Sequence, residues 1–147
     1  EFLVTSLRKA ITQEHCERHH NRVLQGRWHK KVWGCELWVV NSPLYCGKLL
    51  FLEAGYQSSL HRHIKKDETI TMIAGAVDFE LDATSKKYTL LPGESVHIRP
   101  LQWHRFSSHT GAILAEFSTQ HSDKDVERLT KSGRIPERGQ GNERKVG

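Results

Sequence analysis

Five short runs of β-branched and aromatic residues, separated by Gly, Pro, Asn and Asp, fill the middle of this chain. They read WGCELWVV, GKLLFLEAG, ETITMIAGAVDFELD, KYTLLPGESVHIRP and GAILAEFSTQ. Strand-like runs of this length with regular turn signals are typical of an all-β sandwich or barrel. Within AVDFELD, Val77, Phe79 and Leu81 alternate with acidic residues, which predicts a strand with one buried face. A chain of 147 residues is expected to form one domain with a single core.

The two ends of the chain have a different pattern and predict helices. Residues 5–24 contain no Pro or Gly, Leu7 and Ile11 stand four apart, and Gly26 follows as a stop signal. Near the other end, SDKDVERL predicts a short helix with Ser122 or Asp123 as its N-cap. We therefore expect an N-terminal helical extension over 1–31, a barrel over 32–121, and a C-terminal helix with a flexible basic tail over 122–147.

The positive charge lies at the ends of the chain, which argues against a nucleic-acid partner. Residues 1–31 carry seven basic and three acidic side chains, residues 131–147 carry five and two, and the middle is net negative. A nucleic-acid-binding domain would carry a basic stripe on its folded surface. The chain contains no run of 18 apolar residues, so we do not expect a membrane partner. Three cysteines without a CxxC pair favour reduced thiols, and so a cytoplasmic location.

The stretch GYQSSLHRHIKKDETITMIAG contains a candidate metal site. His61 and His63 project to the same face of a strand because side chains alternate. A bend could bring Glu68 back to them, and His104 follows a strand and a proline-containing turn. Three imidazoles and one carboxylate with open positions suit Mn, Fe, Co, Ni or Zn. The alternative is a wet polar face, but Gly55 and Gly75 bracket the run as strand ends, and we favour metal binding.

These residues resemble the cupin superfamily. Its first motif has glycine, five residues, His-x-His, three or four residues, Glu, six residues and glycine, as found here from Gly55 to Gly75. Its second motif has glycine, five residues, Pro-x-Gly, two residues and His. Here Gly93 and His104 keep the spacing, but Arg99-Pro100-Leu101 occupies the Pro-x-Gly slot. The resemblance implies a double-stranded β-helix, or jelly-roll barrel, with a metal held in its mouth by His61, His63, Glu68 and His104.

Flanking segments look like those of sugar-handling cupins. The order of KVWGCELWVVN, YCGKLL, PGESVHIRP and AEFSTQHSDKDVERL is similar to D-lyxose/D-mannose-type isomerases and to the isomerase domain of phosphomannose isomerase–guanylyltransferases. A Trp-Gly pair opens the domain in those families, and an Asp-x-x-Arg segment, matched by Asp125 and Arg128, follows the last strand. The resemblance implies a metal-dependent aldose–ketose isomerase of a small sugar, free or phosphorylated. It also implies a homodimer. For the metal we expect manganese, with Fe, Co, Ni or Zn as alternatives.

Two charged residues in apolar strands are candidate catalytic groups. Glu116 shares a face with Ala112 and Leu114, and burial would raise its pKa toward the range that is useful for a general base. Its alternative role is that of a rim carboxylate paired with Lys or Arg. Lys48 opens the strand CGKLLFL and could donate to a substrate oxygen, or could be a solvated edge residue.

Further residues are candidates for substrate binding. Glu36 and Trp38 share a strand face that could line a sugar site or belong to core and rim. Arg105, together with Lys65, Lys66 and Arg99, could grip a phosphate at the barrel mouth. The competing functions are a cupin iron dioxygenase and a non-catalytic sugar-binding cupin. The pair Lys48 and Glu116 favours isomerisation, because oxygen chemistry relies on the metal and needs no added acid/base pair.

Overall fold

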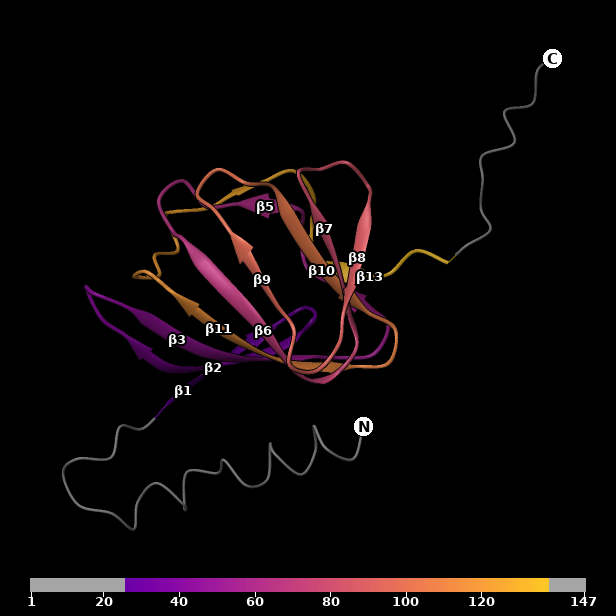
Figure 1. Ribbon diagram of the computed structural model, residues 1–147, viewed down its shortest axis with the longest axis horizontal. Coiled ribbons are helices and arrows are strands. Elements are labelled where there is room, and N and C mark those ends of the chain that lie inside the picture. Colours follow the sequence, from indigo (N-terminus) through magenta and orange to yellow (C-terminus); the bar gives the residue numbers. More distant parts are fainter. Residues whose placement is uncertain (1–25, 138–147) are drawn as a thin grey trace, which may run out of the picture.

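The computed structural model describes residues 26–137, which form two antiparallel sheets facing one another (Figure 1). The first, sheet A, has the strand order β1-β2-β3-β11-β6-β9. Its strands are β1 (Arg27–Lys31), β2 (Gly34–Asn41), β3 (Cys46–Leu52), β11 (Ala112–Ser118), β6 (Glu68–Gly75) and β9 (Ser95–Ile98). The strand β11, far along the chain, thus pairs between β3 and β6 in the middle of the sheet.

The second sheet, sheet B, is built from shorter strands in the order β12-β5-β10-β4-β13, with β7 on β10 and β8 on β7. Its strands are β12 (Glu127–Arg128), β5 (His61–Arg62), β10 (His104–Ser108), β4 (Tyr56–Gln57), β13 (Gly133–Arg134), β7 (Val77–Leu81) and β8 (Lys87–Leu90). The predicted all-β fold is confirmed. Between residues 26 and 137 no helix has the length and hydropathy needed to cross a bilayer.

The core lies between the sheets and is formed by alternate side chains of their strands. Sheet A contributes Leu50, Leu52 and Leu114, and sheet B contributes Phe79 and Phe106. All five have at most 5% of their surface exposed. The expected alternation in AVDFELD holds at Val77, Asp78 and Phe79, where the two apolar residues are buried and the acid is partly exposed, but it ends there because Glu80 is buried as well.

The turn Arg99-Pro100-Leu101, which stands where the cupin motif has Pro-x-Gly, contains a residue in the left-handed backbone conformation. Leu101 has φ 66°, a conformation that glycine adopts freely and a leucine rarely does. Its backbone N–H donates to the carbonyl of His63 at 2.7 Å, which ties the turn to the strand segment of the first motif. The substitution at this slot therefore leaves His104 in place, directly opposite His61 in the pairing of β10 with β5.

The helix predicted over SDKDVERL is wrong, because this segment forms turns and the short strand β12. The Asp125 carboxylate accepts hydrogen bonds from the backbone N–H groups of Lys65 and Lys66, both at 2.9 Å. Residues Glu127–Arg128 pair with β5, and these contacts outweigh a weak helical pattern. Strand pairing also extends beyond the expected barrel boundaries of 32 and 121, through β1 on one side and β12 and β13 on the other. The helix expected over 5–24 lies outside the described residues.

Candidate metal centre

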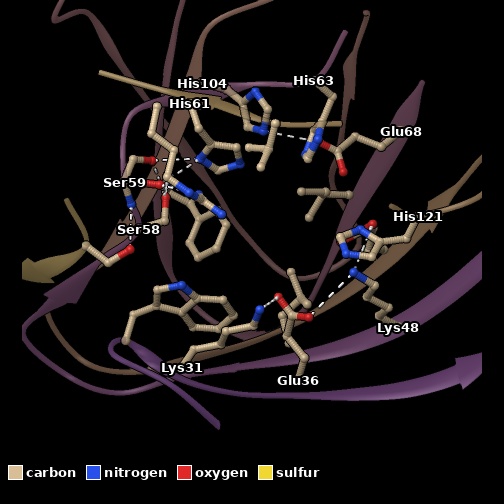
Figure 2. A pocket seen from close by; sticks show the side chains of 18 of the residues that line it. Lys31, Glu36, Lys48, Ser58, Ser59, His61, His63, Glu68, His104 and His121 are labelled. Atoms are coloured by element: carbon tan, nitrogen blue, oxygen red, sulfur yellow. Dashed lines mark hydrogen bonds and ion pairs between the residues drawn. The ribbon is translucent and has the colours of Figure 1, made fainter. Parts of the chain in front are cut away.

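Three histidines converge at one end of the space between the sheets (Figure 2). His61 lies on β5, His63 follows it, and His104 begins β10, which pairs with β5 so that His61 and His104 are direct neighbours. One ring nitrogen of each lies within 4.8 Å of the others. The strand pairing of sheet B therefore brings together imidazoles that are 43 positions apart in the chain.

The second nitrogen of each ring is already engaged, and this fixes the tautomers. All three Nδ1 atoms lie 2.8–3.0 Å from a backbone carbonyl oxygen. A carbonyl can only accept, so each Nδ1 carries the hydrogen and each Nε2 keeps a free lone pair. The pairs are His61 with Ser59, His63 with Asp125, and His104 with Gln102. Oriented imidazoles of this kind are a regular feature of protein metal sites.

Glu68 approaches the same point from β6 in the facing sheet. Its Oε1 lies 3.0 Å from Nε2 of His104 and 3.8 Å from Nε2 of His63. This buried oxygen has no hydrogen-bond partner among the described residues, in keeping with an Nε2 that carries no hydrogen. Lone pairs that converge at such distances repel one another unless a cation lies between them. Three imidazole nitrogens and one carboxylate oxygen therefore fit a divalent transition metal.

A line of alternating charges runs from the candidate metal ligands across sheet A. Lys66 Nζ lies 2.7 Å from Glu68 Oε2 and 2.6 Å from Glu116 Oε1. Glu116 Oε1 is 4.0 Å from Lys48 Nζ, which is 3.5 Å from Glu36 Oε2. All five side chains are buried. Such a network is stable only when every charge keeps its partner, because each ion has been removed from water.

Lys66 is the central cation of this network, whereas the sequence pattern predicts a place for it at the barrel mouth. Burial lowers the pKa of its ammonium group, but the carboxylates of Glu116 and Glu68 outweigh burial and raise that pKa above its usual value. The ammonium is therefore charged at neutral pH. The signal that could have identified it is its place between the ligands His63 and Glu68, which keeps it within reach of both.

Replacing Lys66 with Met is expected to lower the free energy of unfolding of the metal-free protein by about 3–5 kcal/mol. The change leaves two buried carboxylates without their cation. Chemical denaturation, followed by tryptophan fluorescence, measures the effect. Lys65→Met is the matched control, because the neighbouring side chain is exposed and its loss should cost less than about 0.5 kcal/mol. Equal losses in the two variants would contradict the charge network.

The metal-free protein is also expected to lose stability as the pH falls below 6.5. Burial, followed by the nearby Lys66 ammonium, lowers the pKa of His63 from 6.5 to about 4, and burial also lowers that of His61. Between these values the unfolded chain binds protons that the folded chain does not, so the free energy of unfolding decreases. His63 alone accounts for about 2 kcal/mol between pH 6.5 and pH 5. Urea titrations across that interval measure the slope, and a flat profile would contradict it.

The metal-ligand candidates and the charge network line one cavity of about 280 Å³. Its apolar wall is formed by Trp33, Leu50, Ile70 and Phe106. The exposed or partly exposed cations Lys30, Lys31 and Arg128 also contribute to its lining. This volume is near the lower end for small-molecule sites. The cavity therefore combines room for a small polar ligand, an apolar surface and a concentrated set of ionisable groups.

Of the predicted catalytic and substrate-binding residues, Lys48, Glu116 and Glu36 line this cavity. Trp38 is not among the lining residues. Its indole N–H donates to Glu36 at 2.7 Å, and its ring lies 4.5 Å from the Lys48 ammonium, so it supports two lining side chains. The large aromatic surface in the wall is Trp33 instead.

Arg105, the remaining predicted substrate-binding residue, does not line this cavity. Arg105 follows His104 on β10 and points to the opposite side of the strand, since side chains alternate. Its guanidinium donates to Thr130 Oγ1 at 2.7 Å and lies 3.9 Å from Glu80. Neither Lys65 nor Arg99 lines the cavity.

The fold and the site together define a small antiparallel β-barrel domain with a candidate metal centre between its sheets. Residues 48–117 match the family described as the cupin domain. This match agrees with the family resemblance that the motif spacing predicted. No curated protein sequence matches this chain.

Solved structures show the same fold at low sequence identity. KdgF from Halomonas sp. is 17% identical, with a TM-score of 0.59 over 67% of this chain and 89% of that one. The capsular polysaccharide assembling protein CapF from Staphylococcus aureus is 14% identical, with a TM-score of 0.63 over 71% of this chain and 34% of that one. Oxalate decarboxylase from Bacillus subtilis is 17% identical, with a TM-score of 0.60 over 71% and 30%. The chain thus spans about a third of the latter two proteins.

Proposed function

We propose that this protein is a metal-dependent aldose–ketose isomerase of a small sugar of the D-lyxose/D-mannose type, free or phosphorylated. The observation that carries the proposal is the buried Glu116–Lys66 ion pair, which lies in one cavity with three oriented imidazoles and Glu68. The sequence resemblance to sugar cupins supports the same assignment. Manganese is the ion we expect, bound by His61, His63, Glu68 and His104.

The reaction requires two kinds of hydrogen movement. A proton leaves C2 of the aldose and enters C1, while the hydroxyl hydrogen passes from the C2 oxygen to the C1 oxygen, so atoms and electrons balance without a further reactant. A divalent ion held by His61, His63, Glu68 and His104 would act as a Lewis acid on the substrate oxygens and so make the carbon-bound hydrogen more acidic.

The residues of the charge network supply the proton transfers. Glu116 accepts the proton from C2 and returns it to C1, as a general base that becomes a general acid. Lys66 remains charged, holds the Glu116 carboxylate in place, and stabilises negative charge that develops on the substrate. Lys48, next to Glu116 and Glu36, is placed to donate to a sugar oxygen. Trp33 offers an apolar surface for the sugar ring.

The experiment that tests this proposal incubates manganese-loaded protein in D₂O with pentoses and hexoses, free and phosphorylated. NMR should show conversion of at least one aldose to its ketose. Binding without turnover would indicate a non-catalytic sugar-binding cupin. Oxygen consumption that depends on ferrous ion would indicate a dioxygenase, and either result would overturn the isomerase proposal. Light scattering tests the homodimer that we also propose.

A further inference from the structure

His121 lies in the segment after β11 and is held in place from several sides. The Asn41 side chain donates to the His121 carbonyl at 3.1 Å and accepts from the His121 backbone N–H at 2.9 Å. The rings of Trp38 and His121 make an edge-to-face contact, with centroids 4.8 Å apart. Side chains that act on a ligand are commonly fixed in this way by their surroundings.

The tautomer of His121 is fixed as well. Its Nε2 lies 3.1 Å from Asp123 Oδ1, and an ionised carboxylate can only accept a hydrogen bond. The hydrogen therefore resides on Nε2, and Nδ1 carries a free lone pair. This Nδ1 is buried and has no hydrogen-bond partner in the described part of the chain. Buried nitrogens without a partner are rare in folded proteins and call for an explanation.

The surroundings indicate which kind of partner is missing. His121 lines the cavity of the candidate metal centre, and Figure 2 shows its ring on the wall beside Lys48 and below Glu68. Its ring centroid lies 6.5 Å from that of His63, farther than the 4.3–5.8 Å that separate the rings of His61, His63 and His104, so it is not expected to share their ion. A free lone pair on a neutral ring accepts a hydrogen bond from an N–H or O–H donor, and a sugar offers several hydroxyl donors.

We propose that His121 is a specificity-determining residue, whose Nδ1 accepts a hydrogen bond from one hydroxyl group of the bound sugar while Asp123 holds the required tautomer. This inference rests on the proposed function for the identity of the ligand as a sugar. It adds a recognition contact on the wall formed by the residues after β11, distinct from the proton carrier Glu116.

The test measures binding of D-mannose and its monodeoxy analogues to manganese-loaded protein by calorimetry. The Glu116→Gln background prevents turnover during the measurement. In that background, loss of one particular hydroxyl should weaken binding about 10-fold or more, because Nδ1 is then left unpaired. Adding His121→Phe should weaken binding of D-mannose itself and remove most of the difference between D-mannose and that deoxy analogue. His121→Gln, which keeps an acceptor, should retain part of it.

His97→Phe is the matched control. His97 Nε2 also faces a carboxylate, Asp67 Oδ1 at 2.8 Å, but both side chains are about half exposed and neither lines the cavity. The control should preserve full discrimination among the deoxy sugars. Unchanged discrimination in His121→Phe would overturn this inference even if the native protein isomerises sugars. Discrimination that depends on His121 without any turnover in the native protein would support it and overturn the isomerase proposal alone. Absence of sugar binding would overturn both.

Discussion

Glu116→Gln is expected to lower kcat for aldose–ketose conversion about 1,000-fold, with metal content and fold unchanged. The amide cannot accept the proton from C2, but its oxygen can still accept the hydrogen bond that Lys66 donates to Glu116 at 2.6 Å. Substrate binding should therefore change little, and the loss should appear in kcat. Steady-state kinetics of manganese-loaded protein, with the most active sugar of the panel, measure the effect.

Glu53→Gln provides the matched control for this experiment. Glu53 is an exposed carboxylate that does not line the cavity, so the same chemical change there should leave kcat within about 2-fold. A Glu116→Gln variant that retained nearly full activity would contradict the role of Glu116 as the proton carrier. A variant that lost its metal together with its activity would show that Glu116 acts through the metal site instead.

His104→Ala is expected to weaken manganese binding more than about 100-fold and to abolish turnover. The substitution removes the imidazole that lies closest to Glu68, and the remaining donors leave an open side. Calorimetric titration of the metal-free protein with manganese measures the loss. Retention of wild-type affinity would show that the ion binds elsewhere.

A second ligand variant separates metal loss from misfolding. His104 is almost completely buried, so its removal also leaves a void, whereas His61 is partly exposed. His61→Ala should reduce metal affinity in the same direction with a smaller cost in stability. His97→Ala should leave metal binding unchanged, because His97 pairs with Asp67 outside the cavity.

The parts of the fold that depend on local patterns were predictable from the sequence. Alternation in AVDFELD gave the buried face of β7, and turn residues marked the ends of several strands. The spacing from Gly55 to Gly75 and from Gly93 to His104 predicted the cupin domain and the four residues that the structure gathers at one point. These features succeed because strand alternation directly determines which side chains share a face.

The remainder depends on which strands become neighbours, and the sequence pattern does not specify this. The sequence places Lys66 at the mouth because its two carboxylate partners, Glu68 and Glu116, come together only through the pairing of β6 with β11. The helix expected over 122–129 failed because Asp125 and β12 contact the loop and strand of the first motif. His121 was missed because its partners Asn41 and Trp38 lie about 80 positions earlier in the chain.

X-ray absorption spectroscopy of manganese-loaded protein examines the proposed metal centre itself. We expect one ion per chain, with three imidazole nitrogens and at least one carboxylate oxygen in its first coordination sphere. The imidazole contribution should decrease in His61→Ala. A protein that binds no divalent transition metal, or an ion whose coordination sphere contains only oxygen, would contradict the metal centre and the chemistry built on it.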